Sequence, residues 1–101
     1  MALLAGCVEQ KPSKVAIDLC SSIQNMAVAA FNANQRGADK QPTFELLEQS
    51  KKEGMADELY GMSLDALNDA YQQPKITNDQ EASKKAREFS EKHFKACLSK
   101  F

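Results

Sequence analysis

Cysteine and histidine are the residue types of this chain most able to do chemistry, and both are few. The sequence contains three cysteines, Cys7, Cys20 and Cys97, and one histidine, His93. His93 and Cys97 are four residues apart, a spacing that puts two possible metal ligands on one face of a helix. A metal site needs three or four ligands, and the remaining candidates are Cys20 and an acidic residue. A disulfide between Cys20 and Cys97 would consume both thiols. We therefore expect no metal site, and we expect His93 at the edge of the core, hydrogen-bonded or half exposed.

The sequence shows no catalytic or cofactor-binding motif. No nucleophile stands in a pattern with a base and a residue that orients the base. The four glycines, Gly6, Gly37, Gly54 and Gly61, are too far apart to form a phosphate-binding loop. The formal net charge of −1 gives no field that would attract nucleic acid. We therefore expect that the protein is not an enzyme, and that it binds neither a cofactor nor nucleic acid.

The elements that carry these residues are expected to be helices. Glycine and proline are few, and no segment alternates apolar and polar residues as a strand would. Ser13 and Asn78 stand where N-caps are expected, and Gly37 stands where the first helix should end. The expected fold class is all-α: a small helical bundle in which the long first and last helices are antiparallel. The expected helices cover residues 13–36, 42–53, 55–73 and 79–101. The third of them could be interrupted near Gly61.

Each expected helix has an apolar stripe at helical spacing, and these stripes define the expected core. Residues 13–101 should form one helical domain around that core, preceded by a separate segment, 1–12. Tyr60 and Tyr71 could be anchors of an interface, but a place at the edge of the core is the favoured interpretation. The expected inward residues are Val15, Leu19, Cys20, Ile23, Met26, Ala27, Ala30 and Phe31; Phe44, Leu46 and Leu47; Leu59, Met62, Leu64, Leu67 and Tyr71; and Ala82, Ala86, Phe89, His93, Phe94, Cys97, Leu98 and Phe101.

The positions of Cys20 and Cys97 predict a disulfide between the first and the last helix. Sixteen residue steps separate Cys20 from Arg36, and eighteen separate Asp79 from Cys97. In helical form these segments are about 24 and 27 Å long, so antiparallel packing brings the two cysteines to the same end. A disulfide requires an oxidising compartment. The alternative is a pair of reduced, buried cysteines that act as small apolar residues.

The segment Leu4-Ala5-Gly6-Cys7 resembles the lipobox of bacterial lipoproteins. The resemblance implies cleavage before Cys7, acylation of its thiol and its new amino group, and a lipid-anchored protein on the periplasmic side of a membrane. Residues 1–12 would then be a signal-peptide remnant with lipobox, followed by a linker. A signal peptide has a basic start and a longer apolar region, whereas only five residues precede Gly6 and none is Lys or Arg. Either the sequence begins inside its signal peptide, or the segment is an apolar tail that packs on the body.

The order of elements resembles that of small secreted helical proteins of proteobacteria. The shared features are a long first helix with a cysteine, a Tyr-Gln-Gln-Pro stop ending at Pro74, and a last helix that ends in a cysteine. Some members of that group resemble periplasmic acid chaperones or immunity proteins against envelope toxins. The resemblance implies a non-catalytic cell-envelope domain that binds a protein partner, as an inhibitor or immunity-type protein. The alternative is a periplasmic stress chaperone.

The partner surface is expected at the end of the molecule away from the disulfide. Recognition residues are often carried by loops on a rigid scaffold, and two loops should meet at that end. We predict partner contacts for Arg36, Asp39, Lys40 and Lys75. The alternative is that these four residues belong to ordinary solvated turns.

Overall fold

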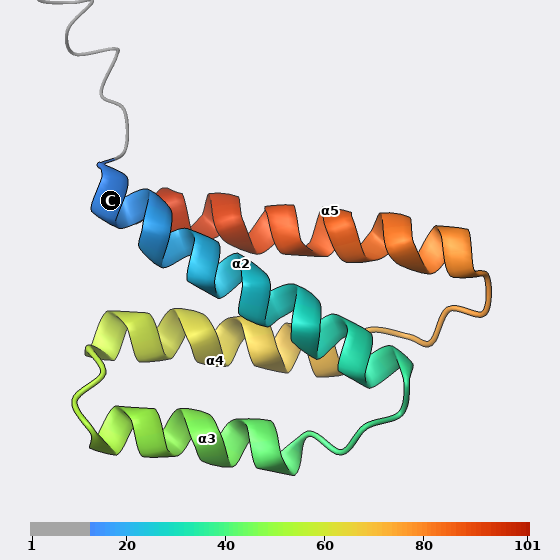
Figure 1. Cartoon of the computed structure of the whole chain (residues 1–101), viewed down its shortest axis with the longest axis horizontal. Helices are drawn as coiled ribbons and strands as arrows, with labels where there is room; N and C mark the ends of the chain where they lie inside the picture. Colours follow the sequence, from blue (N-terminus) through green and yellow to red (C-terminus); the bar gives the residue numbers. More distant parts are fainter. Residues whose placement is uncertain (1–12) are drawn as a thin grey trace, which may run out of the picture.

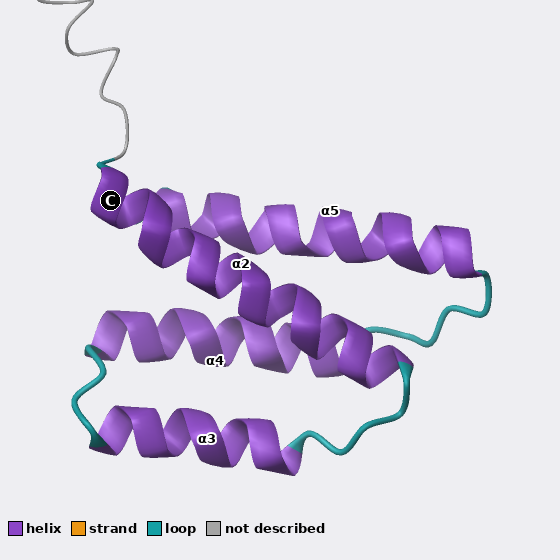
Figure 2. Ribbon diagram, in the orientation of Figure 1, coloured by secondary structure: helices purple, strands orange, loops and turns teal. Residues whose placement is uncertain are grey.

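Four helices follow one another in the computed structural model, which describes residues 13–101. They are α2 (Lys14–Gln35), α3 (Gln41–Lys52), α4 (Asp57–Tyr71) and α5 (Asp79–Leu98), and the described residues contain no strand (Figure 2). The all-α fold class and the four expected helices are confirmed, with ends that differ from the predicted ends by up to three residues. The predictions made for residues 1–12, including Cys7, lie outside the described residues.

The first and last helices pack against each other, and α2 also packs against α4 (Figure 1). In Figure 1 α2 crosses in front of α4 and α5. The helix α3 lies beside α4, which is its main neighbour. The start of α2 and the C-terminus lie together, which confirms the antiparallel arrangement. We call this end, residues 13–20 and 97–101, the disulfide end. The opposite end, formed by residues 36–40 and 72–78, we call the loop end.

Side-chain caps define the starts of the two long helices. The hydroxyl of Ser13 accepts a hydrogen bond from the backbone N–H of Ala16 at 3.1 Å. The side chain of Asn78 accepts one from the N–H of Glu81 at 2.9 Å. At the other end of α2, Gly37 has φ of +79°, a left-handed conformation that glycine adopts without strain. All three helix-end predictions are confirmed, because each depends on a residue within one turn of the boundary.

The third helix, α4, is continuous through Gly61. A break at Gly61 was one expected alternative, since glycine costs about 1 kcal/mol relative to alanine inside a helix. Tertiary packing outweighs that cost, because Ser63, Leu67 and Ala70 on the following turns are buried against the rest of the molecule.

Small residues in α2 and α4 let the two helices approach closely. Ala27, Ala66 and Ala70 are completely buried, and interhelical distance depends on the size of the side chains at the contact. Larger side chains fill the space toward α5, where the rings of Phe31 and Phe89 lie 5.2 Å apart. The buried apolar set is Ala16, Cys20, Ile23, Ala27, Ala30, Phe31, Leu47, Ala66, Leu67, Ala70, Ala86, Phe89 and Cys97.

Three residues predicted to face inward are in fact exposed. Val15 is 76% exposed because its neighbour Ala16 takes the buried position in the first turn of α2. Leu46 is 68% exposed because Leu47 faces α4, and α3 has α4 as its main neighbour. Phe101 is 63% exposed because α5 ends at Leu98, so its apolar stripe does not extend that far.

Candidate functional site

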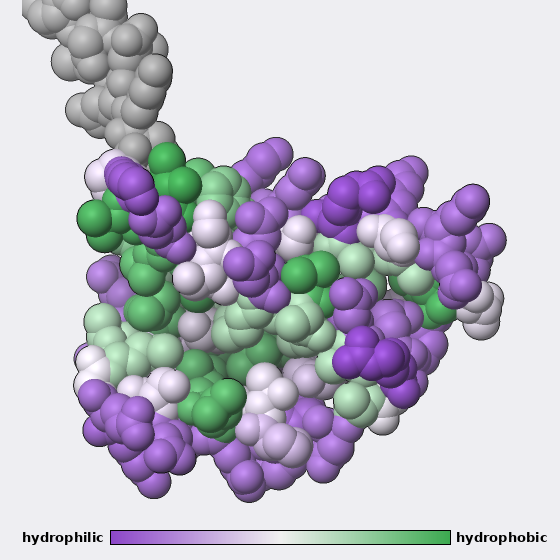
Figure 3. Space-filling model, viewed as in Figure 1, coloured by the Kyte–Doolittle hydropathy of each residue, from purple (hydrophilic) through white to green (hydrophobic). Residues whose placement is uncertain are grey.

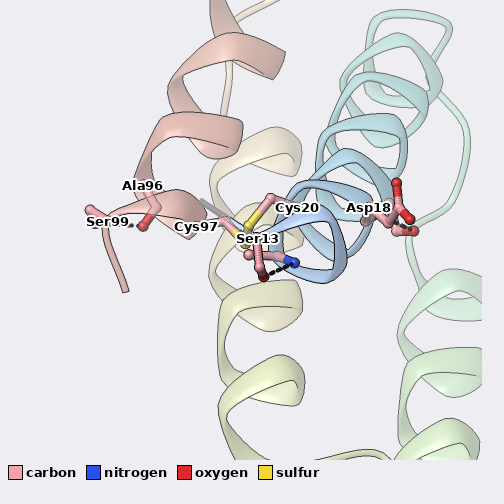
Figure 4. The surroundings of a disulfide bond; sticks show 8 residues. Ser13, Asp18, Cys20, Ala96, Cys97 and Ser99 are labelled. Carbon is pink, nitrogen blue, oxygen red and sulfur yellow. Dashed lines mark hydrogen bonds between the residues drawn. A yellow bond between two sulfur atoms is a disulfide. The ribbon is translucent and has the colours of Figure 1, made fainter. Parts of the chain in front are cut away.

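The disulfide joins α2 to α5 through Cys20 and Cys97 (Figure 4). The two Cα atoms are 5.5 Å apart, and 77 residue steps separate the cysteines in the sequence. Both residues are buried, so solvent-borne reductants have little access to the sulfur atoms. The predicted pairing is confirmed. Since both thiols are consumed, neither cysteine is available as a metal ligand.

Short-range hydrogen bonds stabilise both helix ends at the disulfide. Besides the Ser13 cap of α2, the hydroxyl of Ser99 donates to the carbonyl oxygen of Ala96 at 2.7 Å, near the end of α5 (Figure 4). On the outer face of α2, Lys14 forms an ion pair with Asp18 at 2.9 Å. This pair is highly exposed and contributes little to stability.

The four predicted partner residues lie at the loop end, opposite the disulfide. Arg36, Asp39, Lys40 and Lys75 are all exposed, and they come from the α2–α3 and α4–α5 loops, which lie at the same end in Figure 1. The loops approach each other closely: a Cβ added to Gly37 would lie 3.8 Å from the Nζ of Lys75. The structure therefore brings residues from two separated loops onto one surface.

Two of these residues also have local contacts. The carboxylate of Asp39 accepts a hydrogen bond from the N–H of Gln41 at 3.2 Å, at the start of α3. The Nζ of Lys40 lies 6.0 Å from the centre of the Phe44 ring. Asp39 thus helps to begin α3, whereas Arg36 and Lys75 remain as exposed cationic side chains.

Amide side chains at the end of α2 fix the α4–α5 loop in place. The Nδ2 of Asn34 donates to the carbonyl of Gln73 at 2.8 Å, and the Nε2 of Gln35 donates to the carbonyl of Pro74 at 2.9 Å. The Oε1 of Gln35 accepts from the N–H of Ile76 at 2.8 Å. The sequence analysis did not predict this clamp. The available signal was the pair of amide side chains, Asn34 and Gln35, at the end of the first helix, because the backbone groups of a loop need hydrogen-bond partners that such side chains can supply.

A groove of about 340 Å³ lies between the α4–α5 loop and α5. Phe31 and Phe89, both buried, form its deep part, and Ile76 is half-buried beside them. The exposed residues Lys85 and Glu88 stand at its rim. The groove was not predicted, because its walls come from three segments far apart in the sequence.

His93 lies at the edge of the core, as predicted, and is bound to Asp69 of α4. The Nε2 of His93 lies 2.8 Å from Oδ2 of Asp69, and the Nζ of Lys92 donates to the same oxygen at 2.9 Å. The other oxygen, Oδ1, accepts from the Nε2 of Gln73 at 2.9 Å. The ring of Phe89 covers His93, with 4.7 Å between ring centres. This cluster joins α4 to α5.

The surroundings of Asp69 change its acidity. Burial raises the pKa of the carboxyl, but hydrogen bonds and charges from Lys92 and His93 lower it by more, so the net pKa lies below the ordinary value. Residues 13–101 contain no group of three or more histidine, cysteine or acidic side chains arranged to hold a metal ion.

Tyr60 and Tyr71 connect α4 to α3 at the edge of the core, in agreement with the favoured interpretation. The hydroxyl of Tyr60 donates to Glu48 of α3 at 3.2 Å. The ring of Tyr71 lies 6.1 Å from that of Phe44. Both tyrosines are half-buried in contacts within the chain.

Comparison with known proteins found no relative of this chain. The chain matched no protein-family model, no curated protein and no solved structure. Among the described residues, no helix has both the length and the hydrophobicity needed to cross a membrane.

Proposed function

We propose that this chain is the non-catalytic domain of a bacterial cell-envelope lipoprotein, and that it binds a protein partner through its loop end. The partner would be an envelope enzyme or toxin that the domain inhibits or neutralises. The observation that carries the proposal is the disulfide between Cys20 and Cys97. Disulfides persist in oxidising compartments such as the periplasm and are rare in the cytosol.

The loop end has the properties of a recognition surface on a rigid support. Gln35 binds both Pro74 and Ile76, so the α4–α5 loop is attached to the end of α2. Around this attachment stand the exposed cations Arg36 and Lys75, and beside it lies the groove over Phe31 and Phe89. Binding sites commonly combine an apolar depression with a polar rim.

The anchor is proposed at Cys7, on the residues that resemble a lipobox. The disulfide end is where the described chain begins, so a lipid on Cys7 would direct that end to the membrane. The loop end would then point into the periplasm, where a partner could reach it. Mass spectrometry of protein from native membranes tests this part, with an acylated N-terminal Cys7 as the expected result. An unmodified N-terminus upstream of Cys7 would refute the anchor.

Partner capture tests the surface. A pull-down from envelope extracts should yield one specific protein. Reversing the charges of Arg36, Asp39, Lys40 and Lys75 should weaken its binding at least about tenfold, or about 1.4 kcal/mol. The melting temperature should fall only slightly, because the one hydrogen bond lost is that from the N–H of Gln41 to Asp39.

A matched control reverses three cations and one anion at exposed positions away from the loop end, at Lys52, Glu58, Lys95 and Lys100. Binding by this control should equal that of the unchanged protein. If both variants bind as the unchanged protein does, the loop end is not the partner surface.

A second function, that of a periplasmic stress chaperone, is favoured by the way in which α3 is attached. Two of its contacts with the start of α4 depend on carboxylates: Lys51 pairs with Asp57 at 2.8 Å, and Tyr60 donates to Glu48. The hydrogen bond and the charge of Lys51 lower the pKa of Asp57, so this ion pair is lost as the pH falls through that lowered value. Its loss would weaken the attachment of α3, and detachment of α3 would expose Leu47 and the face of α4 beneath it. Light scattering of a model client at low and neutral pH separates the two functions, since only a chaperone would suppress aggregation in acid.

A further inference from the structure

Large exposed hydrophobic side chains gather at the disulfide end. Among residues 13–101 there are four: Val15 at 76%, Ile17 at 40%, Phe101 at 63% and Leu46 at 68% exposure. The first three belong to the disulfide end, whereas Leu46 stands alone on α3. Single exposed hydrophobic residues are common, but a group at one end of a molecule indicates a contact.

The disulfide places these three residues at the same end of the molecule, with Val15 and Ile17 on different sides of α2 because residues two apart in a helix do not face each other. Val15 and Ile17 precede Cys20 by five and three residues on α2, and Phe101 follows Cys97 by four. Because the Cα atoms of the cysteines are 5.5 Å apart and the helices are antiparallel, all three residues extend toward the same end. Figure 3 shows hydrophobic surface at this end of the molecule. We call Val15, Ile17 and Phe101 the apolar end.

The place of Cys7 in the sequence, close to Ser13, indicates which surface covers the apolar end. Six residue steps separate Cys7 from Ser13, and a segment of that length spans at most about 20 Å. We infer that the apolar end docks onto the surface of the lipid bilayer that holds the anchor. This inference rests on the proposed anchoring at Cys7 and adds a second membrane contact, made by the folded domain itself.

Hydrophobic contact, rather than charge, would dominate this docking. Lys14, the cation nearest to Val15 in the sequence, is already paired with Asp18 at 2.9 Å. Within residues 13–20 and 97–101 the other cation is Lys100, which is exposed beside Phe101. Apolar side chains at an interface enter about 5–10 Å into the boundary between headgroups and acyl chains. Docking should therefore be similar on zwitterionic and anionic vesicles, and it should depend weakly on salt.

Contact of the apolar end with a bilayer can be measured directly by tryptophan fluorescence, because the sequence contains no tryptophan. Phe101→Trp introduces a single reporter at the apolar end, and Leu46→Trp places a matched reporter at an equally exposed position on α3. Since Cys20 and Cys97 are joined, Cys7 is the free thiol, and it can be coupled to a maleimide lipid in phosphatidylcholine vesicles with brominated acyl chains. This coupling supplies the anchor without depending on acylation in cells.

In these vesicles the Phe101→Trp protein should show blue-shifted emission and strong quenching by bromine, while the Leu46→Trp protein should show neither. Adding Val15→Ser and Ile17→Ser to Phe101→Trp should remove most of the quenching. Val15→Trp is a second reporter that should behave as Phe101→Trp does. Circular dichroism confirms that each variant is folded.

Three results would overturn the inference. They are an unquenched Phe101→Trp protein, equal quenching at both reporter positions, and a blue shift in buffer that increases with protein concentration, which would show that a second copy covers the apolar end. Failure of the anchor would be seen separately, as a Cys7 without lipid on protein from native cells, and it would leave the measurement on coupled vesicles unaffected.

Discussion

At the scale of single residues, Asp69 organises the contact between α4 and α5. Its Oδ2 lies within hydrogen-bond distance of Lys92 and His93, and its Oδ1 accepts a hydrogen bond from Gln73. Both the charge and the hydrogen-bonding capacity of the carboxylate are therefore used. The side chain is 26% exposed, which leaves the interactions only partly screened by solvent. Hydrogen bonds to charged groups of this kind stabilise a protein by more than neutral ones do.

Asp69→Asn should lower the free energy of unfolding at neutral pH by about 1–2 kcal/mol, because it removes the charge that Lys92 and His93 share. Folding lowers the pKa of this carboxyl, so its contribution is present above the unfolded pKa of about 3.9 and is lost as the pH falls through the lower folded value. The two proteins should therefore become equally stable in strong acid. Urea unfolding across this pH range measures the difference.

The control for that experiment is Asp65→Asn, at an exposed position one turn earlier on α4. It changes the net charge of the protein by the same amount without touching the cluster. Equal stability of the two variants at neutral pH would show that Asp69 has no special role.

At the scale of elements, the molecule depends on two kinds of link between helices. The disulfide ties the start of α2 to the end of α5, and the amide clamp ties the end of α2 to the α4–α5 loop. One link is covalent and the other is made of hydrogen bonds, so they should respond to different changes.

Replacing Cys20 and Cys97 together by serine should lower the free energy of unfolding by about 4 kcal/mol, because the disulfide restricts a long loop in the unfolded chain. Helix content should be retained, since the apolar faces of α2 and α5 remain. Denaturant unfolding followed by circular dichroism tests both statements. Loss of helix content in the variant without denaturant would mean that the disulfide is needed to form the helices.

Gln35→Ala should loosen the α4–α5 loop while the bundle stays folded. The change removes two hydrogen bonds, to Pro74 and Ile76, which together contribute about 1–2 kcal/mol. Exchange of the Ile76 amide hydrogen should then become about 5–30 times faster. Gln80→Ala, at an exposed position in the first turn of α5, is the control and should leave this rate unchanged.

At the scale of the whole molecule, local patterns predicted the helices and the disulfide well. The caps at Ser13 and Asn78 and the register of the cysteines depend on spacing within single helices, which the sequence displays directly. The exposure of Val15, Leu46 and Phe101 was predicted wrongly, because it depends on which neighbours each helix has. The groove over Phe31 and the cluster around Asp69 join separate helices, so no sequence spacing revealed them.

The disulfide also turns most of the chain into a covalent ring, from residue 20 to residue 97. Exposed loops are the usual sites of proteolytic cleavage, and residues 36–40 form such a loop inside the ring. One cut there would open a peptide bond and still leave a single covalent molecule. In electrophoresis without reductant the cut protein would run as one band, and with reductant as two. Release of a fragment would therefore require a second cut or the reduction of a buried bond.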